Sequence, residues 1–314
     1  MKLTTGTTAV VTGAGSGIGL ALAERFGRAG MNVVLADVAE DALAAAVAKV
    51  GADGGATLAV VTDVSREESV QALAAATLER FGSVQVVCNN AGVVSRADPW
   101  LGPVTAWEWV MGVNFWGVVH GIRAFLPHLV AGGGGHIVNT ASIAGLMPGF
   151  GASYDASKHA VVAVSEDLHL DLRQAAVPVG VSVLCPGWVR TGIMDAERNW
   201  PSTLGEAPPR NDAVQIVTRH VERAIAEATT PAVVADLVAD AVEADRFWVL
   251  PHDDFTSLAV ERWERIAQRL DPEPAAAVPG LPSRDELMAE LLASFAPNAG
   301  PPSDDPPGDE PPGA

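Results

Sequence analysis

Short, valine-rich apolar runs alternate with longer helical patterns from Thr8 to Leu250. Apolar runs of this kind, bounded by Gly, Asp or Pro, are typical of strands that are buried on both faces. When they alternate with helices, the strands pair in parallel and the helices cover both sides of the sheet. We therefore predict an α/β fold with a doubly wound parallel sheet in a single domain. The predicted strands span Thr8–Val11, Asn32–Ala36, Thr57–Val61, Val84–Cys88, His136–Thr140, Val179–Leu184 and Phe247–Leu250, and the predicted helices span Ile18–Ala29, Glu40–Val50, Glu67–Phe81, Ala106–Val130, Ser153–Ala175 and Ala232–Ala244.

The composition changes at Asp271. From there to Ala314 the chain carries 11 of its 22 prolines and nine acids against one base, so −8 of its net charge of −18 lies in this segment. We expect a domain over residues 1–270 and a mostly disordered acidic tail over residues 271–314. A helix is expected at residues 284–295, because Ser283 and Glu286 have the spacing of a capping box and an apolar face follows. That helix could pack on its own domain or on a neighbouring subunit.

The charge and the apolar runs exclude several classes of partner. A net charge of −18 disfavours nucleic acid and anionic membranes as partners. No apolar run reaches the roughly 18 residues of a membrane span, and Met1 and Lys2 leave no room for a signal peptide before the first strand. Cys88 and Cys185 end the strand-like runs Val84–Cys88 and Val181–Cys185, and they lack metal-ligand spacing. We expect buried core thiols, no metal site and a cytoplasmic protein.

A glycine-rich turn joins the first strand to the first helix in the segment Thr12-Gly13-Ala14-Gly15-Ser16-Gly17-Ile18-Gly19. Glycines allow a sharp turn and close approach of the backbone to a pyrophosphate. The helix N-terminus then offers N–H groups and the positive end of its dipole. The glycines at 13, 17 and 19 depart from the G-x-G-x-x-G pattern, because Ile18 stands three residues after Gly15. The alternative is a tight turn that binds nothing.

The second strand ends at Asp37, whose carboxylate could accept hydrogen bonds from the adenosine ribose hydroxyls of NAD. The same charge would repel the 2′-phosphate of NADP, and Ser16 and Val38 offer no positive charge to attract it. We therefore favour NAD as the cofactor. Asp37 could instead only cap the following helix.

Tyr154 is the only tyrosine of the chain, and Lys158, one of three lysines, stands four residues after it. Residues i and i+4 share one face of a helix. A nearby ammonium stabilises a phenolate and is expected to lower the tyrosine pKa from about 10. This pair is suited to acid/base catalysis.

The segment Tyr154-Asp155-Ala156-Ser157-Lys158 is similar to the Y-x-A-S-K motif of the single-domain short-chain dehydrogenases/reductases. Other segments resemble family motifs in the same order along residues 5–250: the glycine turn resembles T-G-x-x-x-G-x-G, Asn89–Gly92 resembles N-N-A-G, and Pro186–Thr191 resembles P-G-x-V-x-T. The resemblance implies a Rossmann-like sheet and an NAD-dependent oxidoreductase.

The resemblance also implies roles for individual residues. The implied catalytic residues are Asn114, which would hold a proton-relay water, Ser142, Tyr154 and Lys158. The implied cofactor-binding residues are Gly13, Ser16, Gly17, Ile18, Gly19, Asp37, Asp63, Val64, Asn90, Ala91, Gly92, Tyr154, Lys158, Pro186, Gly187, Val189 and Thr191. Taken singly, Asp63, Ser142 and Thr191 could be caps, and Asn114 a bond between helices. Ser142 precedes Tyr154 by 12 residues, whereas many family members have 13, and the Gly-rich loop between them could absorb the difference.

The reaction implied is proton removal from a secondary alcohol by Tyr154 with hydride transfer to NAD, or the reverse reduction of a ketone. A lid at about residues 190–230 and the stretch Asp253–Leu270 would cover the substrate. The aromatic residues around them suggest a bulky or apolar substrate, and the candidate lining residues are Phe150, Trp188, Met194, Trp200 and Trp248.

The resemblance further implies a homodimer or homotetramer that is formed through the two long predicted helices, Ala106–Val130 and Ser153–Ala175. The alternatives are an NADP-dependent carbonyl reductase and a non-catalytic NAD-binding sensor or interaction protein.

Overall fold

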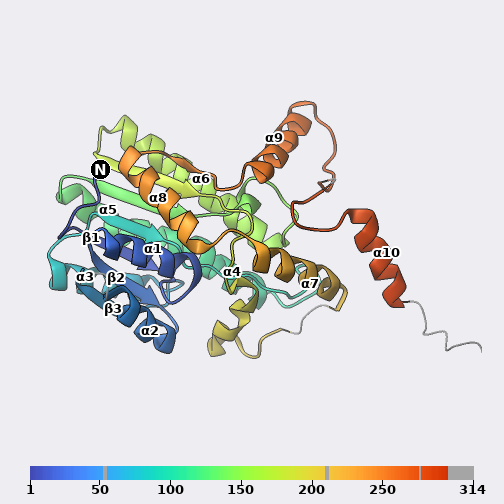
Figure 1. The fold of residues 1–314 in the computed structure, drawn as a ribbon, viewed down its shortest axis with the longest axis horizontal. Coiled ribbons are helices and arrows are strands. Elements are labelled where there is room, and N and C mark those ends of the chain that lie inside the picture. The colour runs from blue at the N-terminus through green and yellow to red at the C-terminus, as the bar shows by residue number, and fades with distance from the viewer. Residues whose placement is uncertain (52–54, 209–211, 276, 296–314) are drawn as a thin grey trace, which may run out of the picture.

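Seven parallel strands form one sheet at the centre of the molecule (Figure 1). The computed structural model describes residues 1–51, 55–208, 212–275 and 277–295. The strands lie in the order β3-β2-β1-β4-β5-β6-β7, which confirms the predicted doubly wound sheet. Their bounds are β1 Thr8–Thr12, β2 Asn32–Asp37, β3 Thr57–Val61, β4 Val86–Asn89, β5 Gly135–Thr140, β6 Val179–Leu184 and β7 Trp248–Val249.

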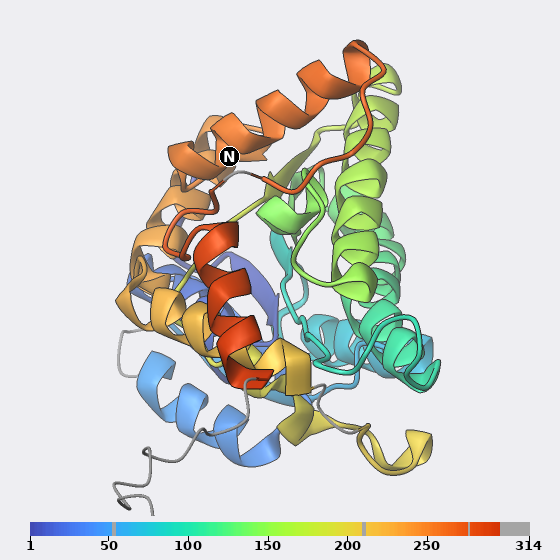
Figure 2. The same cartoon turned by 90° about the vertical axis from the view of Figure 1, so that its right-hand side faces the viewer.

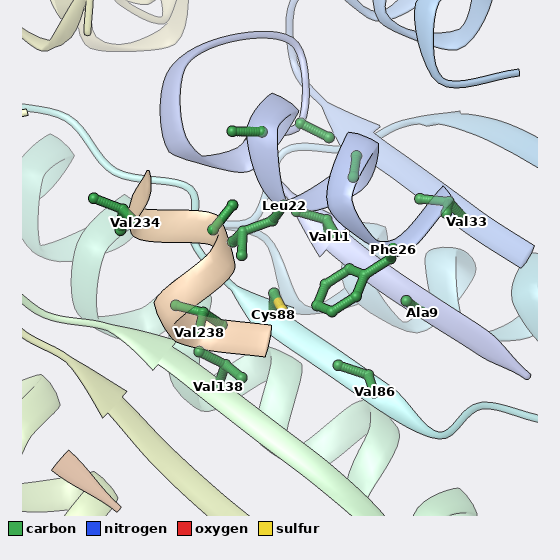
Figure 3. Packing of buried hydrophobic residues seen from close by; sticks show 14 of the residues in the cluster. Ala9, Val11, Leu22, Phe26, Val33, Val86, Cys88, Val138, Val234 and Val238 are labelled. Atoms are coloured by element: carbon green, nitrogen blue, oxygen red, sulfur yellow. The ribbon is translucent and has the colours of Figure 1, made fainter. Parts of the chain in front are cut away.

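Helices cover both faces of the sheet. One face is packed by α1 (Gly17–Arg28), α2 (Glu40–Gly51) and α8 (Pro231–Ala244), and the other by α3 (Glu67–Phe81), α5 (Gly117–Ala131) and α6 (Ala152–Gln174). Figure 3 shows Leu22 and Phe26 of α1 and Val234 and Val238 of α8 directed at the valines of the central strands. Burial of both faces explains why the strands have continuous apolar runs and not an alternating pattern.

The predicted helix Ala106–Val130 is divided in the structure. It consists of α4 (Thr105–Met111), a π-helical turn at Gly112–Trp116, and α5. Hydrophobic periodicity does not reveal the extra residue of a π turn, which is why the sequence predicted one continuous helix. Such turns frequently accompany functional sites, and this one holds the fully buried Asn114.

The chain beyond β7 forms α9 (Asp253–Ala267) and then returns to the domain (Figure 2). It passes through residues 277–283, here called the C-terminal strap, into α10 (Arg284–Phe295), which occupies the interval of the predicted helix. The strap was expected within a mostly disordered tail, whereas the structure places it against the domain. Residues 296–314, also expected to be disordered, lie outside the described residues. Within the described ranges, every helix is too short or too polar to cross a membrane.

Candidate active site

The site lies where the chain reverses direction across the sheet, at the carboxyl ends of the neighbouring strands β1 and β4. Ligands of open α/β sheets bind in the crevice at this point. A cavity of about 1070 Å³ opens there. It brings together the predicted residues Gly13, Ser16, Gly17, Ile18, Asp37, Asp63, Val64, Asn90, Ala91, Gly92, Ser142, Tyr154, Lys158, Pro186, Gly187, Val189 and Thr191. The predicted residues Gly19 and Asn114 do not line this cavity.

The glycine turn forms a cradle at one end of the cavity. Gly13 has a φ of +67°, and a Cβ atom added there would lie only 2.8 Å from the Cα of Ala91. Any side chain would therefore push the turn away from the loop after β4. Gly19 packs behind the turn against the carbonyl of Gly13, so it contributes close packing and no cavity surface.

Two strand-end carboxylates line the same end of the cavity. Asp37 accepts hydrogen bonds from Gly15 N at 2.9 Å and Ala39 N at 3.0 Å. Asp63 accepts bonds from the backbone N–H and the hydroxyl of Ser65. Both residues therefore stabilise turns, but these bonds go to residues outside α2 and α3, whereas the capping alternative requires bonds to N–H groups of those helices. Each ionised oxygen can accept more than one hydrogen bond, so turn formation and ligand binding are compatible.

Asn90 connects three strand ends beneath the cavity. Its Nδ2 donates to Thr12 O at 3.0 Å, and its Oδ1 accepts from Thr140 Oγ1 at 3.1 Å. The predicted cofactor residue thus also fixes β1, β4 and β5 relative to one another. The sequence indicated neither threonine as part of this network.

Ser142, Tyr154 and Lys158 meet at the middle of the cavity. Ser142 Oγ accepts from Ala144 N at 3.2 Å and donates to Pro186 O at 3.3 Å. Lys158 Nζ donates to Thr140 O at 2.9 Å and lies 5.6 Å from the centre of the Tyr154 ring. The two members of the predicted helical pair therefore share a face of α6, as their spacing required.

The pKa of Tyr154 differs from the expectation. Burial raises the pKa of Tyr154 to about 12, and a hydrogen bond with Ser142 opposes that rise. Burial also lowers the pKa of Lys158 to about 8. The expectation that Lys158 would lower the tyrosine pKa is therefore wrong for this structure, because desolvation of the phenolate is the largest effect. At neutral pH the phenol keeps its proton.

The loop between Ser142 and Tyr154 is fixed by Asp155. Its carboxylate accepts hydrogen bonds from Gly149 N at 2.8 Å and Phe150 N at 3.2 Å. Burial raises the pKa of Asp155, and these backbone donors oppose the rise. The loop accommodates the spacing of 12 residues and keeps Ser142 within reach of Tyr154.

Asn114 lies below the cavity floor and is fully buried. Its Oδ1 accepts from Val93 N at 2.8 Å, and its Nδ2 donates to Val93 O and Ser157 Oγ, both at 3.0 Å. The side chain therefore links the π turn to the loop after β4 and to α6. These bonds agree with the alternative in which Asn114 joins two helices. They place the π turn beside α6, the helix that carries Tyr154.

The other end of the cavity is mainly apolar. Phe150, Trp188, Met194 and Trp200 line it as expected. Trp248 does not, because it lies on the edge strand β7 and packs on Phe247. No residue of the described range Asp253–Leu270 lines the cavity either; Phe255 of α9 packs behind Trp188, with ring centres 5.8 Å apart.

Further lining residues carried no signal in the sequence, among them Arg96, Val278 and Leu281. Arg96 is buried and pairs with Glu197 at 3.4 Å and Glu222 at 3.6 Å. It thereby connects the loop after β4 to the 3-10 helical segment Ile193–Asn199 and to α7 (Asp212–Glu227). Val278 and Leu281 belong to the C-terminal strap, whose Pro-rich composition suggested disorder.

Comparison with known proteins agrees with this geometry. Residues 7–202 match the family model described as short chain dehydrogenase. The chain is 42% identical over 270 residues to 1-deoxy-11-beta-hydroxypentalenate dehydrogenase of Streptomyces avermitilis, covering 85% of this chain and 92% of that protein. It is 31% identical over 262 residues to the CLA biosynthesis dehydrogenase/reductase of Lactiplantibacillus plantarum, covering 82% of this chain and 91% of that protein.

A solved structure is also similar. A short chain dehydrogenase/reductase from Burkholderia phymatum, in complex with NAD, superposes with a TM-score of 0.85 at 42% identity, covering 88% of this chain and 100% of that one. The family model covers more than half of the chain, and the sheet order and cavity match the expectation from the motifs. The chain belongs to the short-chain dehydrogenase family.

Proposed function

We propose that this protein is an NAD-dependent dehydrogenase that interconverts a bulky, apolar secondary alcohol and its ketone. The observation that carries the proposal is the position of Ser142, Tyr154 and Lys158 between the two ends of one cavity. One end has a glycine cradle and an acidic strand end, and the other end is aromatic and aliphatic. A substrate oxygen at the Ser142 and Tyr154 hydroxyls would lie between a cofactor and an apolar substrate pocket.

The glycine cradle fits a dinucleotide, because Ser16, Gly17 and Ile18 line the cavity at the N-terminus of α1, and a helix N-terminus binds a pyrophosphate through its backbone N–H groups. The residues that would hold the cofactor are those of the turn, Asp37, Asp63, Lys158 and the segment Pro186–Thr191. The uncharged Ser16, Val38 and Ala39 surround Asp37 in the cavity, which favours NAD over NADP. The relative from Burkholderia phymatum, solved with NAD, supports the same choice.

A bound nicotinamide supplies acceptance or donation of a hydride at the substrate carbon. The residues of this chain orient the substrate and move the proton. Ser142 donates a hydrogen bond to the substrate oxygen after its hydroxyl turns away from Pro186 O, and Tyr154 gives or removes the proton at that oxygen. With a pKa of about 12, Tyr154 is protonated at neutral pH and is ready to act as the acid in ketone reduction.

Two alternatives remain distinct from this proposal. An NADP-dependent carbonyl reductase would need a positive charge where Asp37 stands. A non-catalytic NAD-binding sensor would not need a serine hydroxyl, a tyrosine and a lysine at one point of the cavity. The alcohol-bearing substrate named for the Streptomyces avermitilis relative also supports a dehydrogenase.

Turnover by a Tyr154→Phe variant tests the proposal. The variant should lose about 10²- to 10⁴-fold in kcat, because it lacks the group that transfers the proton. Its affinity for NAD should be unchanged, since the phenyl ring still packs in the site. Nicotinamide absorbance with secondary alcohols measures kcat, and calorimetric titration with NAD measures affinity. Near-normal turnover by the variant would exclude Tyr154 as the acid/base.

We further propose that the protein assembles as a homodimer or homotetramer through α5, α6 and the π turn between α4 and α5. These elements expose large apolar side chains: Trp116 is 50% exposed and Leu170 is 63% exposed. The two free, buried cysteines suit a reducing compartment such as the cytoplasm.

A further inference from the structure

The C-terminal strap forms part of the wall at the apolar end of the cavity. Val278 and Leu281 line the cavity together with Phe150, Trp188 and residues of α7. Val278 also belongs to an apolar cluster with Ile143, Met147 and Phe255. The strap therefore presents aliphatic side chains to the place where the proposed substrate would extend away from Tyr154.

One attachment fixes the strap to a motif of the cofactor site. Trp188 Nε1 donates a hydrogen bond to Pro279 O at 2.7 Å, across 91 residues of sequence. The Trp188 ring is itself held by edge contacts with Phe150 and Phe255, at centroid distances of 5.6 and 5.8 Å. Because Trp188 follows Pro186 and Gly187, the strap lies next to the segment that would hold the nicotinamide.

A second attachment fixes the strap through α10. Glu290 pairs with Arg219 at 3.3 Å and with His220 at 2.8 Å, both on α7. Figure 2 shows α10, in red, beside α7, in gold. Another face of α7 lines the cavity through Val221 and Ile225. The strap is therefore attached at both ends to elements that already form the pocket.

We propose that the C-terminal strap is a specificity-determining element, in which Val278 and Leu281 contact the apolar body of the secondary alcohol. This inference rests on the proposed function and adds the part of the site that selects the substrate. Aliphatic side chains select by size and apolar area, and one methylene in such a pocket changes kcat/KM by roughly 10- to 200-fold. For a substrate too small to reach the strap, kcat/KM should not depend on Val278 and Leu281.

Kinetics with alcohols of different size test the inference. Borneol has a bulky apolar body beside its secondary alcohol, whereas isopropanol has only two methyl groups. Leu281→Ala removes the contact and Leu281→Trp fills the space, so each should lower kcat/KM for borneol at least roughly tenfold and leave isopropanol unchanged. Met288→Ala is the matched control, since Met288 lies on α10, is 46% exposed and does not line the cavity. Equal borneol-to-isopropanol ratios in the wild type and both Leu281 variants would overturn the inference.

A labelling experiment gives an answer that does not depend on turnover. Both native cysteines are buried, so N-ethylmaleimide should react slowly with the wild-type protein. A Leu281→Cys variant should be labelled, and borneol with NAD should slow its labelling roughly tenfold at about ten times the dissociation constant. A Met288→Cys variant should be labelled at the same rate with and without these ligands. A labelling rate at position 281 that does not change when borneol is added would overturn the inference. Protection from labelling without any turnover would contradict the proposed reaction but would still support the contact between the strap and the substrate.

Discussion

Asp37 combines a structural role with a proposed role in cofactor selection. It accepts hydrogen bonds from the backbone of Gly15 and Ala39, and it also faces the cavity. Asp63, two residues after β3, repeats this arrangement with Ser65. The two carboxylates differ in their expected partner, which is the ribose for Asp37 and, as the family resemblance implies, the adenine amino group for Asp63. This difference allows their roles to be separated experimentally.

An Asp37→Ala variant should lose its preference for NAD over NADP. Removing the charge ends the repulsion of the 2′-phosphate and deletes charge-assisted hydrogen bonds of about 1.5–3 kcal/mol, so the ratio of kcat/KM values should shift by about 10- to 100-fold. Asp63→Ala is the control, because it also deletes a strand-end carboxylate but should weaken both cofactors alike. The measurement is nicotinamide absorbance with each cofactor. An unchanged preference in Asp37→Ala would remove the ribose assignment.

The strands β5 and β6 contain a buried histidine on the side of the sheet away from the site. His136 is 1% exposed, and its Nε2 lies 2.7 Å from Ser182 Oγ on the neighbouring strand. Its Nδ1 is 3.8 Å from Asp245, which follows α8. Burial lowers the pKa of His136 from 6.5 to about 4, although Asp245 opposes that shift. The pairing of these strands therefore depends on a neutral imidazole.

The free energy of unfolding should decrease as the pH falls, because of His136. Above pH 6.5 the histidine is neutral in both folded and unfolded chains and contributes no pH dependence. Between pH 6.5 and 4 only the unfolded chain binds the proton. The free energy of unfolding should then decrease by about 1.4 kcal/mol per pH unit, to a total of about 3 kcal/mol.

A His136→Gln variant isolates this effect, because glutamine can still bond to Ser182 but does not titrate. Urea unfolding at pH 7.5 and pH 4 should show the wild type losing about 3 kcal/mol more than the variant over this interval. Equal losses of unfolding free energy in the wild type and the variant would show that His136 is not the group responsible for the loss of stability at low pH.

Exposed apolar side chains lie on several elements of the described part of the molecule, among them α6, the π turn and α8. Leu170 on α6 and Trp116 at the π turn lie on the elements proposed to form the subunit interface, whereas Val233, 50% exposed, lies on α8 across the sheet. A charge placed on a free surface usually changes stability by less than 0.5 kcal/mol. The same charge within an apolar subunit interface would oppose association.

The mass of the protein in solution tests the proposed assembly. Analytical ultracentrifugation should give a multiple of the 32.4 kDa chain. Leu170→Glu should shift the sedimenting species toward the single chain, and Val233→Glu should leave it unchanged. A wild-type protein that sediments at 32.4 kDa at micromolar concentration would contradict the assembly through α5 and α6.

The sequence by itself determined the layout of the sheet, the glycine turn and the pair Tyr154 and Lys158. These features are local: apolar period, glycine spacing and an i, i+4 offset each follow from a few consecutive residues. Six of the seven predicted strands lie within one residue of the observed bounds at both ends, the exception being β4, which starts two residues later than predicted.

Only the tertiary structure decided the remaining features, because each depends on segments far apart in the chain. Burial by the whole fold raised the pKa of Tyr154 against the local effect expected from Lys158. The bonds of Asn114 to Val93 and Ser157 accompany a π turn that periodicity does not record. The strap reaches the cavity through a contact across 91 residues, Trp188 to Pro279, and composition alone predicted disorder there. Burial and long-range contact are properties of the folded chain, so no short segment encodes them.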